Sequence, residues 1–107
     1  MSAEPPANSQ EAIAAAAATV KRVVTICNQK GLHARAAARF VKAAHDFDAE
    51  MWERKNGTLV NGRSIMGLMM LAAASGAELQ ISAAGPEADS AVETLARLVE
   101  CKFDEGC

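Results

Sequence analysis

The order in which strand-like and helix-like stretches alternate, β-α-β-β-α-β-α, limits the fold of this chain more than any other feature. β-branched runs and apolar–polar alternation are typical of strands, and they predict four, at 22–27, 50–55, 58–61 and 78–83. Asn56 and Gly57 join the middle two in a hairpin, because both tolerate the positive φ of a type I′ turn. Met51 and Glu53 share one face of this hairpin and Trp52 lies on the other, and the pattern leaves open which face is core.

Three stretches have apolar residues at helical spacing, at 34–47, at 65–74 and from Pro86 to Phe103. Ser64 before the second stretch and Gly76 after it are a typical helix cap and helix stop. We therefore expect an α+β fold, an open-faced two-layer sandwich in which three helices cover one face of a four-stranded antiparallel sheet.

At 107 residues the chain fits one compact domain. Residues 1–20 have a composition that buries little apolar surface, so we expect a flexible N-terminal extension followed by one domain at 21–107. The alanine-rich part of the extension, 11–18, favours a helix, but so short a helix is marginal when it is isolated.

Composition excludes several classes of function. Lys and Arg number 11 and Asp and Glu 13, for a net charge of -2, so the chain lacks the positive field that binds nucleic acid or an anionic membrane. No stretch is apolar and long enough for membrane insertion. Three cysteines without CxxC spacing argue against a disulfide framework or a zinc site. We expect a cytoplasmic monomer with reduced thiols, no cofactor and no metal, since no second ligand residue lies at suitable spacing from His33.

The residues best suited to chemistry lie where the first strand gives way to the first helix. Gly31 supplies the backbone freedom of that junction and puts His33 at the helix N-terminus. Amides of the first turn have no intrahelical partners, so those of Ala34, Arg35 and Ala36 would hold an anion beside the imidazole. The Arg35 guanidinium adds a permanent positive charge, and the positive helix end favours an uncharged, nucleophilic imidazole. These are the main requirements of a phosphoryl acceptor, although a lone histidine near a helix start is more often a cap or a surface residue.

Two motifs together resemble those of HPr, the histidine-containing phosphocarrier family of the bacterial phosphotransferase system. They are Gly-Leu-His-Ala-Arg at 31–35 and Ser-Ile-Met-Gly-Leu-Met at 64–69. The resemblance covers about 23–103, and the predicted order of elements agrees with the open-faced sandwich of that family.

The resemblance implies that enzyme I, which draws on phosphoenolpyruvate, phosphorylates His33 on Nδ1 and that the group then passes to an EIIA protein. Arg35 matches the active-site arginine of the family. Ser64 matches a regulatory serine that an ATP-dependent HPr kinase/phosphorylase modifies in some bacteria, although serine is also the expected N-cap there. The resemblance thus implies a carrier that depends on partner enzymes and is not itself an enzyme.

Ala36 stands where the family usually has proline. Alanine restores an N–H group in the first turn and removes a rigid ring. It resembles the nitrogen-branch variant of the family, NPr, which serves regulation more than sugar import. The alternative function is therefore a regulatory binding module of that type, which acts through phosphorylation-dependent contact with partner proteins.

The second predicted helix is apolar nearly all round, and so small a domain cannot bury every residue of it. Helical spacing turns Leu68 and Leu71 toward the sheet. It leaves a deformable interface for partner proteins, formed by Ile65, Met66 and Met69. The alternative is that all these side chains belong to the core.

Overall fold

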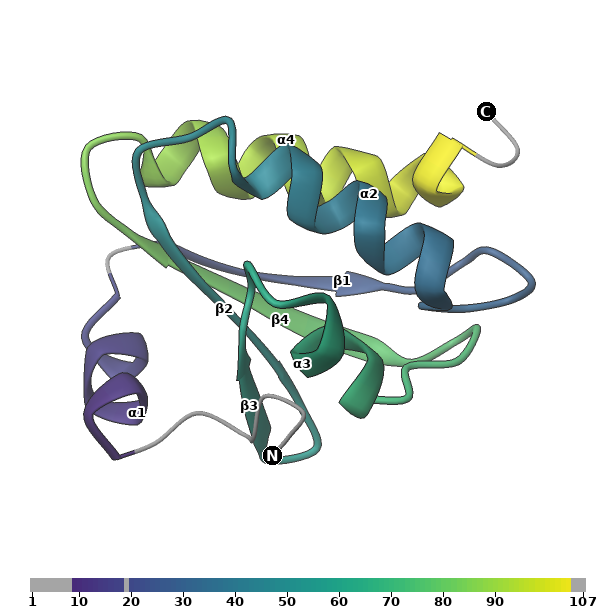
Figure 1. Cartoon of the computed structure of the whole chain (residues 1–107), viewed down its shortest axis with the longest axis horizontal. Helices are drawn as coiled ribbons and strands as arrows, with labels where there is room; N and C mark the ends of the chain where they lie inside the picture. The colour runs from purple at the N-terminus through teal and green to yellow at the C-terminus, as the bar shows by residue number, and fades with distance from the viewer. Residues whose placement is uncertain (1–8, 19, 105–107) are drawn as a thin grey trace.

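The structure is a computed structural model that describes residues 9–18 and 20–104. Its antiparallel sheet has the strand order β1-β4-β2-β3 (Figure 1). The strands are β1 (Val20–Thr25), β2 (Glu50–Lys55), β3 (Thr58–Asn61) and β4 (Glu78–Ala84). The helices of one face are α2 (Ala34–Ala44), α3 (Ile65–Met70) and α4 (Ala88–Glu100), and the 3-10 helix η1 (Lys102–Asp104) follows α4. The predicted α+β open-faced sandwich is confirmed.

The main core lies between the sheet and these three helices, with α2 and α4 side by side over the strands (Figure 1). Leu79 and Ile81 of β4 point into it and meet Phe40 of α2 and Leu95 of α4, all fully buried. The alternation of β4 is what produces this, because successive side chains of a strand point to opposite faces. The clean pattern at 78–83 therefore predicted the inner face of the central strand correctly.

The hairpin of β2 and β3 turns at Asn56 and Gly57, which both have positive φ (49° and 86°), as the type I′ turn requires. Its two faces are both buried, which explains why the sequence did not distinguish them. Met51 and Glu53 face the main core, whereas Trp52 lies on the outer face of the sheet and is only 3% exposed.

Helix α1 (Ser9–Ala16) covers that outer face, at the lower left of Figure 1. Ala15 of α1 is buried in a second apolar cluster together with Trp52 and Leu59. Contact with the sheet stabilises this helix, which would be marginal alone, so part of the predicted extension packs on the outer face through small side chains. The first eight residues of the predicted extension lie outside the described residues.

The predicted end of the second inner-face helix is also wrong. α3 ends at Met70, with Leu71 as its C-cap, and Ala72 has a positive φ of 50°. The Nζ of Lys55, on β2, donates to the carbonyls of Leu71 (3.1 Å) and Ala72 (3.5 Å). A side chain distant in sequence thus satisfies the carbonyls at the helix end, and Gly76 is not the stop.

The last helix begins two residues later than predicted, at Ala88, with Glu87 as N-cap and Pro86 outside it. Its apolar stripe does reach Phe103, which is fully buried, although the chain has already left the α-helix there and Phe103 has a φ of 54°. α2 ends at Ala44 and not at Phe47, whose side chain nevertheless packs against the core. No helix in the described ranges is long and apolar enough to cross a bilayer.

Candidate functional site

His33 is the N-cap residue of α2, as predicted. Its backbone is extended (φ −80°, ψ 178°), and its carbonyl accepts the first intrahelical hydrogen bond, from the N–H of Ala37 at 2.8 Å. The imidazole is half-buried and does not serve as a side-chain cap for the helix. It therefore lies at the positive end of an eleven-residue helix, within reach of an incoming group.

The loop before His33 is fixed by backbone geometry. Gly31 has a φ of +67°, and a Cβ there would lie 2.5 Å from the carbonyl oxygen of Ala73, so no other residue fits without displacement. Leu32 N–H donates to that same Ala73 carbonyl at 2.8 Å, and the side-chain amide of Asn28 donates to the Gly31 carbonyl at 2.7 Å. These bonds hold the loop against the segment that follows α3, so the His33 and α3 surfaces are neighbours.

The surroundings of His33 suit an anion. The amides of Ala34, Arg35 and Ala36 form the first turn, where N–H groups have no intrahelical acceptor. Arg35 is exposed, and its guanidinium makes no hydrogen bond or ion pair with the described residues. Ala36 is fully buried, so it contributes packing and a backbone N–H. The predicted cradle residues are thus brought together around one helix end.

Ser64 is the N-cap of α3, and its Oγ accepts the N–H of Gly67 at 3.0 Å. The predicted capping role of this serine is confirmed. Gly67 packs closely here, because a Cβ on it would lie 3.3 Å from Cβ of Val60 and 3.4 Å from Oγ of Ser64. The hydroxyl is partly exposed.

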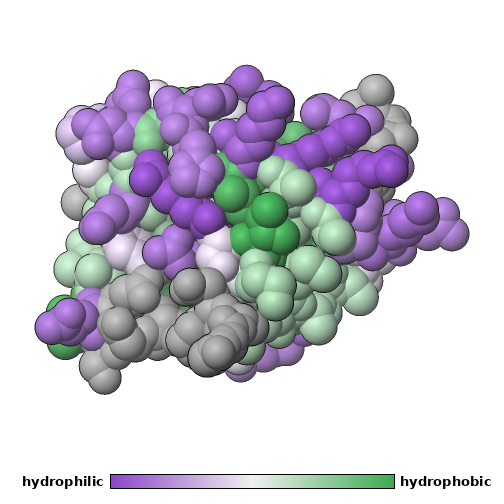
Figure 2. Space-filling view, viewed as in Figure 1, coloured by the Kyte–Doolittle hydropathy of each residue, from purple (hydrophilic) through white to green (hydrophobic). Residues whose placement is uncertain are grey.

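The predicted split of α3 into a buried and an exposed side is also seen. Leu68 and Leu71 are buried, and the alternative that the whole helix is core is wrong. Figure 2 shows the other side as a green apolar area over α3, bordered by purple hydrophilic residues. Its large apolar members are 40–50% exposed, namely Ile65, Met66, Met69 and Met70. Met70 belongs to this exposed side as well, although the sequence reasoning assigned it to neither side.

Other charged residues near α2 serve the fold or face the solvent. Arg39 donates to the carbonyl of Phe103 and so ties α2 to the turn after α4. His45 is the C-cap of α2 and is exposed, at the end of the helix opposite to His33. Over 9–18 and 20–104, no three His, Cys, Asp or Glu residues gather as a metal site.

The sequence left open which face of the hairpin is core, so it did not predict the burial of a carboxyl group in β2. Glu53 of β2 is completely buried in the inner face, and neither of its carboxyl oxygens has a hydrogen-bond partner. A Cβ on Gly62 would lie 2.6 Å from Oε2, so the glycine makes room for this carboxyl group. Burial raises the pKa of Glu53 well above its ordinary value. The carboxyl group lies beside Gly62, two residues before Ser64.

Known proteins are similar to this chain in both sequence and fold. A family model described as the PTS HPr component phosphorylation site matches residues 20–101. Phosphocarrier protein HPr of Neisseria meningitidis is 44% identical over 81% of this chain and 98% of that protein. Phosphocarrier protein NPr of Shewanella violacea is 40% identical over 80% of this chain and 94% of that protein. The crystal structure of HPr-C-His from Thermoanaerobacter tengcongensis matches 83% of this chain and 100% of that chain, with 38% identity and a TM-score of 0.79.

Proposed function

Because this chain belongs to the HPr family of phosphocarrier proteins, we propose that His33 carries a phosphoryl group from enzyme I to an EIIA protein of the phosphotransferase system. The observation that carries the proposal is the half-buried imidazole at the N-cap of α2, beside first-turn amides and an exposed Arg35. Members of this family are carriers and not catalysts in themselves. The proposal also locates the chain in the cytoplasm, with its partner enzymes.

The transfer depends on the position of the His33 imidazole and on the positive groups around it. In the first step, the lone pair of Nδ1 of His33 forms an N–P bond while the bond from phosphorus to the donor atom of enzyme I breaks, and that atom keeps the electron pair. The first-turn amides and the Arg35 guanidinium then stabilise the charge on the phosphoryl oxygens. In the second step an EIIA nucleophile takes the phosphoryl group and the N–P electron pair returns to the imidazole.

The geometry of the site favours a protein partner over a small substrate. His33 stands at the start of a helix next to the apolar area of α3, whose large side chains are 40–50% exposed. Exposed methionines suit several partners because their side chains adapt in shape. Docking of enzyme I or EIIA on Ile65, Met66 and Met69 would therefore bring its reactive group to the neighbouring imidazole.

Labelling with enzyme I and phosphoenolpyruvate tests the proposal. Wild type is expected to gain one acid-labile phosphoryl group, and His33→Ala none. His45→Ala is the matched control, since His45 is the other histidine of the chain and lies at the opposite end of α2. Labelled His33→Ala, or unlabelled His45→Ala, would contradict the assignment of the acceptor.

A second candidate function is a regulatory binding module of the nitrogen-branch type. It is favoured by the position of Ser64, whose partly exposed hydroxyl lies at the edge of the apolar area formed by Ile65, Met66, Met69 and Met70. A phosphate on Ser64 would sit at the start of α3 and change the charge of that area, so its main effect would fall on partner binding. HPr and NPr relatives match at comparable identity, so identity favours neither branch.

Transfer to a set of purified EIIA proteins separates the two functions. The carrier is expected to pass its label to at least one sugar-type or nitrogen-type EIIA. If none is labelled, and a partner protein binds only one phosphorylated form of the chain, the regulatory function is the correct one.

A further inference from the structure

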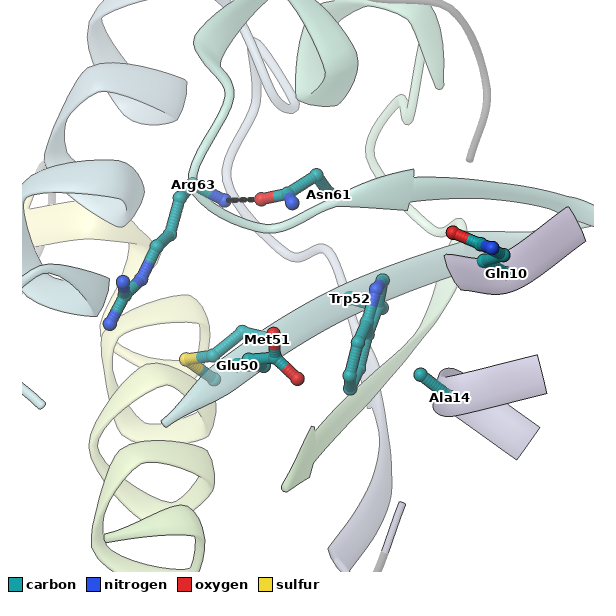
Figure 3. A pocket seen from close by; sticks show the side chains of 7 residues that line it. All are labelled: Gln10, Ala14, Glu50, Met51, Trp52, Asn61 and Arg63. Atoms are coloured by element: carbon teal, nitrogen blue, oxygen red, sulfur yellow. Dashed lines mark hydrogen bonds between the residues drawn. The ribbon is translucent and has the colours of Figure 1, made fainter. Parts of the chain in front are cut away.

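The outer face of the sheet carries an apolar surface that the phosphocarrier function does not use. Its large members are Trp52, the only tryptophan in the chain, and Leu59, and both are buried. Ser82, opposite Trp52 on β4, is buried as well. Helix α1 covers this apolar surface. Its Ala15 is 3% exposed, and its Ala14 faces the Trp52 ring in Figure 3.

Small side chains make this contact. Ala14, Ala15 and Ala18 pack against the outer cluster, whereas Ile13, the largest apolar residue of α1, is 70% exposed. Alanine methyl groups bury little apolar area, and an eight-residue helix is marginal without tertiary contact. α1 is therefore held far more weakly than α2 or α4, and its helical state depends on its contact with Trp52.

The contact is also incomplete along one edge. A cavity of about 380 Å³ remains beside Trp52, with residues of β2, β3 and α1 in its wall (Figure 3). Its lining comprises Gln10, Ala14, Glu50, Met51, Trp52, Asn61 and Arg63. This space is partly open to solvent, so α1 does not cover the outer face of the sheet completely along this edge.

From these observations we infer that the outer face at Trp52 and Leu59 is a helix-docking surface, and that α1 occupies it in cis as a reversible cover. The tryptophan supplies a broad apolar anchor, and small residues at 14 and 15 let the backbone of α1 approach it closely. The N-terminal segment is then a part of the fold that can be released, and its release uncovers Trp52.

The covered surface is separate from the phosphoryl acceptor. α1 leads into the start of β1 at Val20, whereas the loop to His33 leaves its other end after Thr25. Six strand residues span roughly 20 Å, and α1 and α2 lie on opposite faces of the sheet. The state of α1 should therefore leave acceptance of phosphate at His33 unchanged, and a failure of one proposal does not imply failure of the other.

Two variants with the same chemical change test the inference. Ala15→Glu puts a carboxylate into the contact with Trp52, whereas Ala17→Glu puts one on an exposed position two residues further along. In Ala15→Glu we expect a red shift of Trp52 emission and stronger quenching by acrylamide. Ala17→Glu is expected to match wild type in both, and both variants should be labelled by enzyme I at the wild-type rate.

Three outcomes would overturn the inference. If Ala15→Glu and Ala17→Glu both give wild-type emission and quenching, α1 does not cover Trp52 in solution. If Ala15→Glu loses far-UV circular dichroism of the whole domain, α1 is an integral core element and not a reversible cover. If wild-type emission shifts to the blue only as protein concentration rises, with doubling of the mass in sedimentation, the cover is a second copy and not α1 in cis.

Discussion

Helices α2 and α3 both begin at an N-cap residue with extended backbone, yet the two side chains are used differently. At α3 the Ser64 hydroxyl accepts the Gly67 N–H at 3.0 Å, so the first turn is satisfied from within the protein. At α2 the His33 imidazole makes no such bond, so no side chain of the N-cap residue satisfies the first-turn amides. The N-cap side chain thus caps its helix at α3 and does not do so at α2.

The supports beneath the two helix starts differ as well. The loop before His33 is fixed by backbone hydrogen bonds and by Gly31, where a Cβ would lie 2.5 Å from the Ala73 carbonyl oxygen. The segment before Ser64 passes over Glu53, a buried carboxyl group without a hydrogen-bond partner. The start of α2 is therefore held by hydrogen bonds, whereas the segment before Ser64 lies beside a buried carboxyl group whose pKa is raised by burial.

Replacing His33 by serine should give the largest effect, because it removes the difference between the N-cap side chains of α2 and α3. His33→Ser gives α2 the same type of cap as α3, so labelling by enzyme I is expected to vanish. The free energy of unfolding should rise by up to about 1 kcal/mol, since a capping hydroxyl satisfies one first-turn amide. Labelling and urea unfolding of one preparation measure both. A clear fall in stability would show that the imidazole also supports the fold.

Gly31→Ala tests the firmness of the loop before His33. The new Cβ would lie 2.5 Å from the Ala73 carbonyl oxygen at a φ of +67°, so we expect a loss of about 3 kcal/mol together with slower labelling. Gly57→Ala is the matched control, because φ is +86° there and nothing lies within 4 Å. That variant should lose only about 1 kcal/mol in urea unfolding. Equal losses would mean that the Ala73 contact gives way easily.

Glu53→Gln tests whether the buried carboxyl group makes the stability of the domain depend on pH. Its effect should be smaller than that of Gly31→Ala and larger than that of Ser64→Ala. Burial raises the pKa of Glu53 above its ordinary value of 4.5, so the folded state holds a proton that the unfolded chain releases first. Wild-type stability is therefore expected to fall as pH rises from about 4.5 through the raised pKa, relative to the glutamine variant, with no such difference at lower pH. Thermal unfolding across pH measures this. Glu50→Gln, at an exposed position of the same strand, should retain the wild-type pH dependence.

The sequence predicted those features that short stretches of chain determine. Alternation at 78–83 gave the inner face of β4, Asn56 and Gly57 gave the hairpin turn, and Ser64 gave the start of α3. The position of His33 followed in the same way, since a glycine between a strand and a helix restricts where the helix begins.

What the sequence did not predict depends on residues that meet only in the folded chain. The end of α3 is set by Lys55, which reaches its carbonyls from β2. The docking of α1 needs Trp52, more than thirty residues further along, and the burial of Glu53 needs Gly62 beside it. Local propensity carries no information on such pairs, so tertiary contact overrode it at each of these places.

The smallest expected effect comes from removing the cap that α3 does use. Ser64→Ala leaves the Gly67 N–H without its 3.0 Å acceptor, so the free energy of unfolding should fall by about 1 kcal/mol. Labelling of His33 by enzyme I should continue, because the acceptor belongs to the other helix start. Ser64→Asp restores a capping oxygen and should recover most of the stability, which separates the cap from any modification of the hydroxyl. If Ser64→Ala instead abolishes labelling at unchanged stability, the two helix starts form one functional unit, and the division of roles between them fails.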